Sequence, residues 1–313
     1  MIEVIIKPKA KKNIISTVLI SKKFYNRWKK YIFKNWKVYC NNHGLGLIII
    51  KDFIDKTETK KKANWQKLLI GKKLKEHNFR FKIENICYLD SDIIINCHGA
   101  PNIFNYHKKN RISVVNQYKQ LPYNYFETQK RISLLRNLFY SKKYPLDSSI
   151  FMTPQQIFKY HGFKKFDNYF CSGLFVFNLN KHSSFLEKIY FKYKKETKTL
   201  TGGDEPVINY EFQKLGNLNW LDYKYQAIWL FEMANKYPFL YKFGKNNHKL
   251  QSECVSSSLF SNYFLHFAGS WYESDMIYLK NNYTLNKSRN FIKNFYDYLN
   301  EKPKANPVGI IRP

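Results

Sequence analysis

The sequence predicts an α/β protein with a mixed, mostly parallel central sheet flanked by helices. Short runs of Ile, Leu and Val alternate with longer stretches in which apolar residues recur at helical spacing. In the first hundred residues the predicted elements follow the order strand, helix, strand, helix, strand. In this order each helix crosses over between two neighbouring strands, which then run parallel. A chain of 313 residues with 18% aromatic residues can also bury a sizeable core and does not have the composition of a disordered protein.

The first part of the chain supplies three strands and two helices. Strands are predicted at 13–20, 47–50 and 86–95, where apolar and β-branched residues cluster. Helices are predicted at 22–43 and 63–76, where aromatic residues and leucines fall near one face. In such sheets ligands collect at the carboxyl ends of the strands, so residues that follow a strand are candidates for a site.

The later part continues the alternation. Segments 111–115 and 170–178 are predicted as strands, and 127–140 and 181–195 as helices. Segment 264–269 is typical of a strand that ends in a glycine turn.

Residues 1–300 are expected to form a single domain, because no internal repeat and no clear linker divides them. Segment 118–165 is the least regular part, with turn signals at Pro145 and Pro154. It is either a lid or substrate-binding insert or a divergent loop. The end of the chain, 301–313, is expected to be a basic tail that is only partly ordered.

The chain is strongly basic, with 53 Lys and Arg against 23 Asp and Glu and a formal net charge of +30. This charge fits nucleic acid, an anionic membrane surface or anionic small molecules as partners. The lysines are spread along the chain, and Lys, Asn, Ile, Tyr and Phe are all abundant, which also fits the bias of an AT-rich genome. A functional basic surface and compositional drift are both open interpretations.

Five cysteines form neither a Cys-x-x-Cys pair nor a metal-ligand spacing. Their odd number and wide separation favour reduced thiols in a cytosolic compartment. Cys87 and Cys171 lie in apolar runs and are expected to be small core residues. The apolar run 14–20 is too short for a membrane helix. We therefore expect a cytoplasmic protein, with peripheral membrane contact as the alternative to a purely soluble one.

The most informative motif is Asp90-Ser91-Asp92, which lies between apolar flanks in segment 86–95. Burying an unpaired carboxylate is costly, so two of them need a cation or a tight hydrogen-bond network. Carboxylate oxygens at the end of a strand are suitable ligands for Mg²⁺ or Mn²⁺. The motif therefore predicts a divalent-metal site.

Three further motifs contain polar residues in or beside apolar segments. Ser172-Gly173 opens the strand 170–178, Asp204-Glu205 precedes Pro206 at a helix start, and His266 lies three residues before Gly269. Each has a simpler structural interpretation. Asp204 suits a helix N-cap, and a lone histidine in an apolar strand is commonly a core residue.

These motifs together resemble GT-A-fold glycosyltransferases, most closely family 8, which includes lipopolysaccharide galactosyl- and glucosyltransferases and glycogenin. The resemblance covers about residues 18–272 and depends on the order and spacing of the motifs. Trp65-Gln66-Lys67-Leu68-Leu69 is also similar to that family's Tyr-x-Arg-Leu-Leu helix, with lysine in place of arginine. The fold that the resemblance implies is GT-A, a Rossmann-like mixed sheet.

The family's roles carry over to the matching residues. The resemblance implies that Asp90, Asp92 and His266 hold Mn²⁺ or Mg²⁺. It implies that Asp204 and Glu205 are catalytic, with Asp204 facing the donor sugar and the acceptor. The residues that it assigns to substrate binding are Lys67, Ser91, Ser172, Gly173, Gly269 and Trp271. For Lys67 the alternative is a solvated helix face.

The activity that the resemblance implies is transfer of a hexose from a nucleotide-sugar to a glycan, glycolipid or other hydroxyl acceptor. The same likeness implies retention of anomeric configuration, with UDP as the default nucleotide. Because no nucleophile is obvious in the sequence, front-face displacement by the acceptor is the mechanism we expect. Acceptor binding would fall to the insert around 118–165. No nucleic-acid partner is expected. The alternatives are a catalytically inactive binding protein of this fold and a basic nucleic-acid-binding protein with stacking aromatic residues.

The sequence departs from the family in two places. No acidic residue follows the strand 13–20, where the family recognises the nucleotide base. The family's Lys-Pro-Trp after the His-x-x-Gly turn is shortened to Ser270-Trp271, so the lysine that neutralises the leaving diphosphate is missing. The candidates to replace it are Lys245, Lys249 and Lys280.

Overall fold

The computed structural model describes residues 1–9, 12–57, 63–140, 149–193, 203–244, 246–269 and 272–279. These residues belong to one compact unit, Met1–Asn282. The predicted tail 301–313 and the predicted substrate-binding residue Trp271 lie outside the described residues, as do Lys245 and Lys280.

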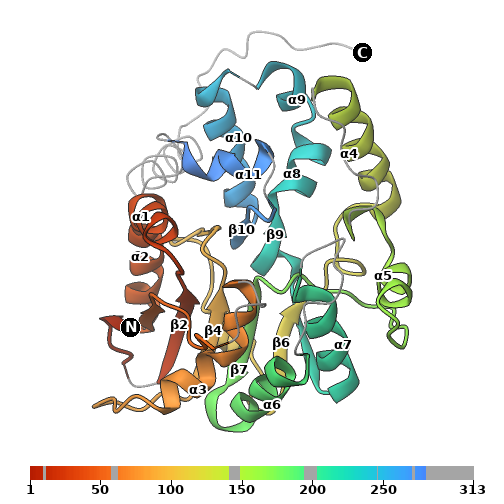
Figure 1. The fold of residues 1–313 in the computed structure, drawn as a ribbon. Coiled ribbons are helices and arrows are strands. Elements are labelled where there is room, and N and C mark those ends of the chain that lie inside the picture. The colour runs from red at the N-terminus through yellow and green to blue at the C-terminus, as the bar shows by residue number, and fades with distance from the viewer. Residues whose placement is uncertain are drawn as a thin grey trace, which may run out of the picture. The chain divides into compact units, whose positions relative to one another are not determined.

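The described residues form a central seven-stranded sheet (Figure 1). Its strands are β1 (Ile2–Ile6), β2 (Asn13–Val18), β3 (Gly46–Ile50), β4 (Asn85–Leu89), β6 (Ile112–Val115), β7 (Leu174–Asn178) and β8 (Leu218–Leu221). They lie in the order β1-β3-β2-β4-β7-β6-β8, and β1 and β7 run against the other five. The prediction of a mixed, mostly parallel sheet flanked by helices is confirmed.

A second sheet divides the predicted strand 86–95 into two. The chain leaves the main sheet after β4, turns at Asp90-Ser91-Asp92 and enters β5 (Ile93–Ile95). β5 pairs with β10 (Phe264–His266), which also pairs with β9 (Ala227–Ile228). The prediction of one strand was wrong because both halves are equally apolar, and their partners come from distant parts of the chain. β1, which pairs with β3 at the sheet edge, was not predicted.

Helices cover the main sheet on both faces. On one face, η1 (Ala63–Leu69), α3 (Ile70–Lys75), α6 (Leu179–Lys192) and α7 (Glu205–Leu215) contribute to one core. This core takes alternate residues of the strands, such as Ile48 and Ile86, as the two-residue period of a strand requires. The other face is covered by α2 (Phe33–His43), which contacts β3 and β5.

The predicted helix 22–43 is broken at Ile32 into α1 (Lys22–Tyr31) and α2. Two side chains of α2 hold β5 in place. The Asn35 amide donates to Ile95 O (2.6 Å) and accepts from Ile95 N (2.8 Å), and Trp36 Nε1 donates to Ile93 O (2.8 Å). Because β5 begins directly after Asp92, α2 also fixes the carboxyl side of the Asp-Ser-Asp turn.

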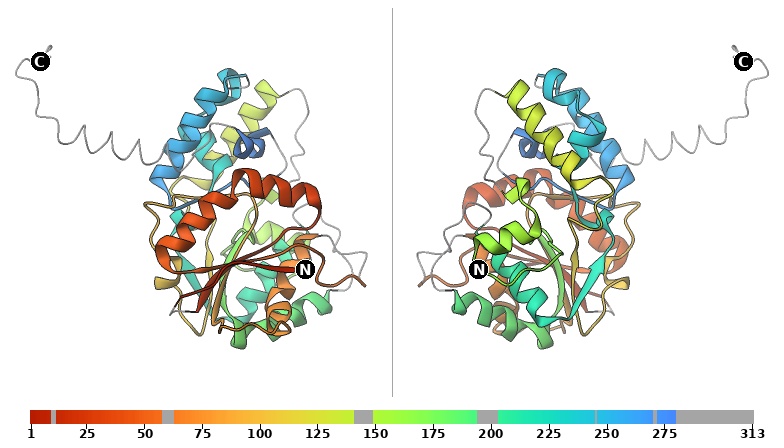
Figure 2. Two further views of the ribbon diagram at one scale, coloured as in Figure 1. Left: turned by 90° about the vertical axis from the view of Figure 1, so that its left-hand side faces the viewer. Right: turned by 90° about the vertical axis from the view of Figure 1, so that its right-hand side faces the viewer.

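A group of helices lies together at the top of Figure 1, beyond the strands, and Figure 2 shows the same grouping from two sides. It consists of α4 (Tyr125–Phe139), α8 (Trp229–Lys236), α9 (Leu240–Phe243), α10 (His248–Ser261) and α11 (Tyr272–Asp275). We call it the helical layer. The predicted helix 127–140 corresponds to α4. Segment 118–165 also contains η3 (Ser149–Phe151) and α5 (Pro154–Tyr160), so its described part is more regular than the sequence indicated.

The remaining elements are the 3₁₀ turns η2 (Ile103–Asn105), η4 (Tyr223–Gln226) and η5 (Met276–Tyr278). Among the described residues, we find no helix with the length and apolar character needed to cross a membrane.

Candidate metal and donor site

The turn Asp90-Ser91-Asp92 leaves the carboxyl end of β4 and is tied to two other strands. Asp90 N donates to Gly173 O (2.8 Å), next to the start of β7. Phe267 N donates to Asp92 O (3.0 Å), directly after β10. The backbone therefore brings three distant motifs to one edge of the sheet.

The predicted metal ligands Asp90, Asp92 and His266 form a cluster at this edge, with one ligand atom from each within 4.8 Å of the others. His266 Nε2 lies 3.2 Å from Asp92 Oδ1 and 4.0 Å from Asp90 Oδ2. Within the described chain the buried Asp92 Oδ1 has no hydrogen-bond donor of good geometry, although it faces the histidine ring. Two carboxylates and one imidazole are suitable ligands for Mn²⁺ or Mg²⁺, so these side chains fit the metal ion that the sequence predicts.

Gly173 lies directly against this cluster. A Cβ at this position would overlap the His266 ring and stand 2.8 Å from Asp90 Oδ2. The φ angle of Gly173 is not in the left-handed region, so the glycine is required here for space rather than for backbone freedom. This explains why a small residue follows Ser172 at the start of β7.

The other nitrogen of His266 faces Gln226 and Cys171. Gln226 Nε2 is 3.2 Å from His266 Nδ1, and Cys171 Sγ is 3.6 Å away. Gln226 is fully buried, and its Oε1 has no partner among the described residues. With the amide turned, Oε1 accepts the Nδ1 proton and the lone pair of Nε2 is left for a cation, the usual arrangement of a metal-binding histidine.

Protonation of His266 depends on the same neighbours. Burial lowers its pKa, but Cys171 and the Asp92 carboxylate outweigh burial and raise the pKa well above the usual value. Burial in turn raises the pKa of the Cys171 thiol to about 11. A cation at the cluster therefore competes with a proton on His266.

A buried ion pair lies beside the cluster. Lys67 Nζ is 2.7 Å from Asp204 Oδ2, and both side chains are 2% exposed. Lys67 also donates to Ser172 O (3.1 Å) and Ser172 Oγ (2.9 Å), and the Asn64 amide donates to Asp204 Oδ1. Lys67 is thus not on a solvated helix face. Asp204 stands at the N-cap position of α7, but its side chain makes no capping hydrogen bond there.

Electrostatics keep this pair charged. Burial lowers the pKa of Lys67, but the Asp204 and Asp90 carboxylates outweigh burial and raise it above the usual value. Burial also raises the pKa of the Asp204 carboxyl, and Lys67 opposes that rise. The Asp204 and Asp90 carboxylates thus favour the protonated form of Lys67, and its ammonium group is held within electrostatic reach of Asp90.

The other predicted site residues lie around this edge with different surroundings. Glu205 Oε2 accepts from Ser172 N (3.1 Å), and burial raises its pKa. Ser91 is half-buried in the turn between the two aspartates. Gly269 is exposed after β10 with a φ of 99°, in the left-handed region that favours glycine.

Sequence reasoning missed three polar partners: Asn64, Tyr88 and Gln226. The Tyr88 hydroxyl donates to Asp90 Oδ1, and its ring lies 5.5 Å from Lys67 Nζ. Tyr88 had a recognisable signal, because it stands two residues before Asp90 on the same side of the strand. Asn64 and Gln226 had none, because both act on residues far away in the sequence.

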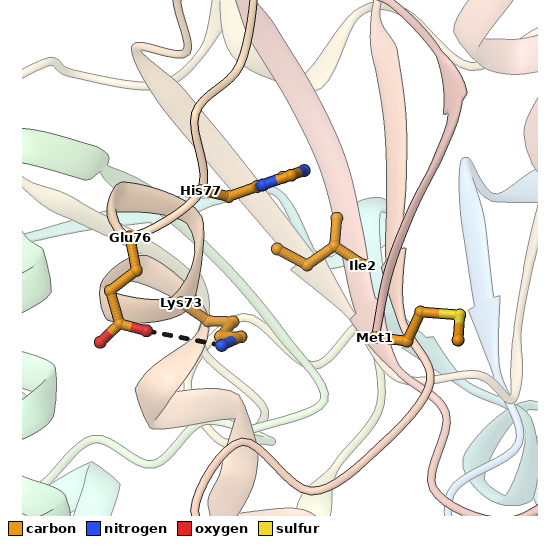
Figure 3. Close-up of a pocket in the computed structure, with 5 residues that line it drawn as sticks. All are labelled: Met1, Ile2, Lys73, Glu76 and His77. Carbon is orange, nitrogen blue, oxygen red and sulfur yellow. Dashed lines mark ion pairs between the residues drawn. The ribbon is translucent and has the colours of Figure 1, made fainter.

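A surface pocket of about 290 Å³ lies elsewhere, beside β1 and α3 (Figure 3). Its lining residues are Met1, Ile2, Lys73, Glu76 and His77. Lys73 and Glu76 form an ion pair of 3.5 Å there. None of the lining residues belongs to the Asp90–Asp92–His266 cluster.

Comparison with known proteins finds similarity in three dimensions only. No family model matches the sequence, and no curated protein matches it. A glycosyltransferase involved in glycosylation of the major capsid of PBCV-1 is 10% identical, with 84% of this chain and 98% of that chain covered and a TM-score of 0.45. The glycosyltransferase GlyE of Streptococcus pneumoniae TIGR4 is 12% identical, with 95% and 67% covered and a TM-score of 0.43.

A third solved structure, the galactosyltransferase LgtC in complex with donor and acceptor sugar analogs, is 10% identical. The alignment covers 88% of this chain and 99% of that chain, with a TM-score of 0.41. Because these scores are below 0.5, the function proposed below is inferred from the geometry of the site.

Proposed function

We propose that this protein is a GT-A-type, metal-dependent glycosyltransferase that moves a hexose from a nucleotide-sugar to a hydroxyl acceptor. The observation that supports this most is the Asp90–Asp92–His266 cluster at the carboxyl edge of the sheet. Gly173 lies against it, and the ionised Lys67–Asp204 pair stands beside it. A cation site next to a fixed carboxylate is what transfer of a sugar from a diphosphate requires.

Asp90, Asp92 and His266 Nε2 would hold Mn²⁺ or Mg²⁺, which when bound supplies positive charge to the diphosphate leaving group. Tyr88 and Gln226 position two of these ligands through the Asp90 carboxylate and the His266 Nδ1 atom. Gly173 carries no side chain where the His266 ring and Asp90 Oδ2 lie, so both ligands can keep their positions.

Asp204 is proposed to stabilise positive charge that develops at the anomeric carbon. Its carboxylate is held by Lys67 and Asn64, so it does not need to reorient during the reaction. Glu205 already accepts the Ser172 N–H, so we assign it a positioning role at the start of β7. Without a free nucleophilic carboxylate assigned in the described part of the site, we favour front-face displacement by the acceptor, with retention.

The partners proposed are a nucleotide-sugar, with UDP as the first nucleotide to test, and a glycan or glycolipid acceptor. The described part of segment 118–165 carries α4, η3 and α5. We assign acceptor recognition to this segment.

A thermal-shift screen tests the proposal. UDP-, GDP-, ADP- and CMP-sugars are added with and without Mn²⁺ to the wild type, to Asp92→Asn and to Asp167→Asn, an exposed aspartate that serves as the matched control. We expect one nucleotide to stabilise the wild type and Asp167→Asn only with Mn²⁺, and Asp92→Asn not at all. Transfer activity should fall about a hundredfold or more in Asp92→Asn.

Two other outcomes would contradict the proposal. If no sugar nucleotide shifts the unfolding temperature, the proposed metal-dependent transferase function is wrong. Stabilisation of the wild type without hydrolysis or transfer of the donor would identify a binding protein that has kept the site but lost catalysis.

A further inference from the structure

Helices α1 and α2 belong to a stretch of the chain that is basic and contains no acidic residue. No Asp or Glu occurs between Glu3 and Asp52, although the chain has 23 of them, and twelve Lys and Arg lie in that stretch. An even spread of acids would place several there, so a general enrichment in lysine does not account for it. The stretch is therefore a candidate for a functional basic surface rather than for compositional drift.

The lysines of these two helices occupy outward positions. Trp28, Ile32 and Trp36 are buried and hold α1 and α2 against the rest of the protein. In the left view of Figure 2 the two helices follow one another on the side that faces the viewer. Six of their lysines are exposed: Lys22, Lys23, Lys29, Lys30, Lys34 and Lys37. We call these six lysines the basic face.

The charges of the basic face are unfavourable for the fold itself. Within the described chain, no carboxylate lies at ion-pair distance from any of the six lysines. Lys22 and Lys23 stand in the first turn of α1, where the helix dipole favours anions. Lys34 and Lys37 lie three residues apart on α2 and repel each other. An anionic partner would offset all three effects.

Aromatic rings accompany these lysines. Phe24 is 50% exposed in the first turn of α1. Lys29 Nζ lies 5.6 Å from the centre of the Tyr25 ring, and Lys30 Nζ lies 5.0 Å from that of Tyr31. Aromatic rings beside lysines are typical of protein surfaces that lie in the headgroup region of a membrane. There the lysines contact lipid phosphates and an exposed ring reaches the apolar boundary, which a soluble acidic glycan does not offer.

The use of lysine also favours a lipid surface over nucleic acid. Recognition of nucleic acid makes use of the planar guanidinium of arginine, which binds phosphates in a fixed geometry. All six members of the basic face are lysines. Their point charges need no fixed geometry and respond to the negative potential of anionic headgroups.

We propose that the basic face docks on an anionic lipid bilayer, with Phe24 at the headgroup boundary. This docking is independent of the proposed activity, because it uses no residue of the Asp90–Asp92–His266 cluster. β2 and β4 are parallel neighbours, and α1 starts four residues after β2 ends. The surface that would contact lipid therefore begins at the same edge of the sheet as the candidate site.

The test is cosedimentation of the full chain with lipid vesicles. The vesicles contain phosphatidylcholine alone or phosphatidylcholine with phosphatidylglycerol, and random-sequence duplex DNA is the soluble polyanion for comparison. The basic-face variant combines Lys22→Gln, Lys30→Gln and Lys34→Gln. The matched control combines exposed lysines of the helices on the other face of the main sheet, Lys75→Gln, Lys188→Gln and Lys214→Gln.

We expect the wild type to bind vesicles that contain phosphatidylglycerol, to lose this binding at high salt, and not to bind phosphatidylcholine alone. The basic-face variant should bind about tenfold to a hundredfold more weakly, and the control less than about threefold. The unfolding temperature of the basic-face variant should be no lower than that of the wild type, because repulsion within the helices is removed. Phe24→Ser should weaken vesicle binding about threefold to tenfold and leave DNA binding unchanged.

Three results would overturn the proposal. If the wild type does not bind the anionic vesicles, the basic face is not a lipid surface. If both triple variants lose vesicle binding equally, net charge rather than this face drives the binding. If the basic-face variant loses DNA binding but keeps vesicle binding, the face binds nucleic acid. The sugar-nucleotide screen tests the proposed activity separately, so a failure of the lipid proposal leaves that activity standing.

Discussion

Two buried ion pairs of the same length lie in different parts of this molecule. Lys67 and Asp204 are 2.7 Å apart at the edge of the sheet, and Arg136 and Glu273 are 2.7 Å apart in the helical layer. All four side chains are at most 2% exposed. The two pairs therefore share the same burial and the same N···O distance, and they differ in residue types and in surroundings.

The pair at the sheet edge stands beside a cluster of metal-ligand type, and its lysine feels the Asp90 carboxylate. The pair in the helical layer joins α4 to α11 among tyrosine rings, with Tyr140 packed on Tyr241 and Tyr272. A buried ion pair alone therefore does not indicate function. The groups that its charges act on decide whether it supports chemistry or holds helices together.

Variants of the two ion pairs test whether one pair serves catalysis and the other stability, and they should give the largest effects. Arg136→Met leaves Glu273 buried without its partner and should cost about 3–5 kcal/mol of unfolding free energy. Arg136→Met with Glu273→Leu should recover most of that loss and keep transfer activity. Lys67→Met with Asp204→Leu should also fold, but its activity should fall about a hundredfold or more. Urea unfolding and a transfer assay measure both.

Equal activity losses in the two double variants would show that the pairs do not differ in role. Full activity in Lys67→Met with Asp204→Leu would remove Asp204 from the proposed mechanism.

Adding one methyl group at Gly173 should weaken metal binding at the sheet edge, whereas adding one at an open position elsewhere should not. Gly173→Ala places a Cβ against His266 and 2.8 Å from Asp90 Oδ2, so the ligands must move. We expect Mn²⁺ affinity to fall about tenfold to a hundredfold, by analogy with the loss of other groups that orient ligands. Gly162→Ala is the control, because its Cβ meets nothing within 4 Å and its φ of 69° costs only local strain. Calorimetric titration with Mn²⁺ measures both variants, and equal affinities would contradict the proposed crowding.

Two buried glutamines allow a comparison of the same kind. Gln226→Leu removes the group that faces His266 Nδ1, and should weaken Mn²⁺ binding by about tenfold or more. Gln251→Leu, in the helical layer, removes a donor to Gly244 O (2.6 Å) and should lower stability without changing Mn²⁺ affinity. Nitrogen NMR of the wild type bound to diamagnetic Mg²⁺ should show the proton of His266 on Nδ1. A proton on Nε2 would contradict the role given to Gln226.

The smallest expected effect is a dependence of Mn²⁺ binding on pH. The pKa of His266 is raised above its usual 6.5, so at and just above that pH the cation must displace a proton. Affinity should therefore rise with pH, by up to about tenfold per unit, until the raised pKa is passed. Without metal, the free energy of unfolding should change with pH in the opposite direction. The charged histidine stabilises the fold at low pH, and this contribution is lost as pH rises through the raised pKa. Titrations in buffers of different ionisation enthalpy count the released protons, and no release would contradict the prediction.

The fold class could be predicted from short-range patterns of apolar residues. Apolar runs of strand length and helical periodicity predicted the strands around 13–18, 46–50 and 112–115 and the α/β order. The Asp90-Ser91-Asp92 motif was recognisable because carboxylates between buried strands are costly wherever they lie. The break between β4 and β5, and the break between α1 and α2, could not be predicted, because both depend on contacts with distant elements.

The sequence by itself therefore determined the class of fold and the types of residue available for a site. Only the tertiary structure decided which of them meet: His266 with Asp92, and Lys67 with Asp204. The physical reason is that propensity and periodicity act over a few neighbouring residues. Distances between ligands depend on strand order, and strand order is fixed by packing between segments far apart in the chain.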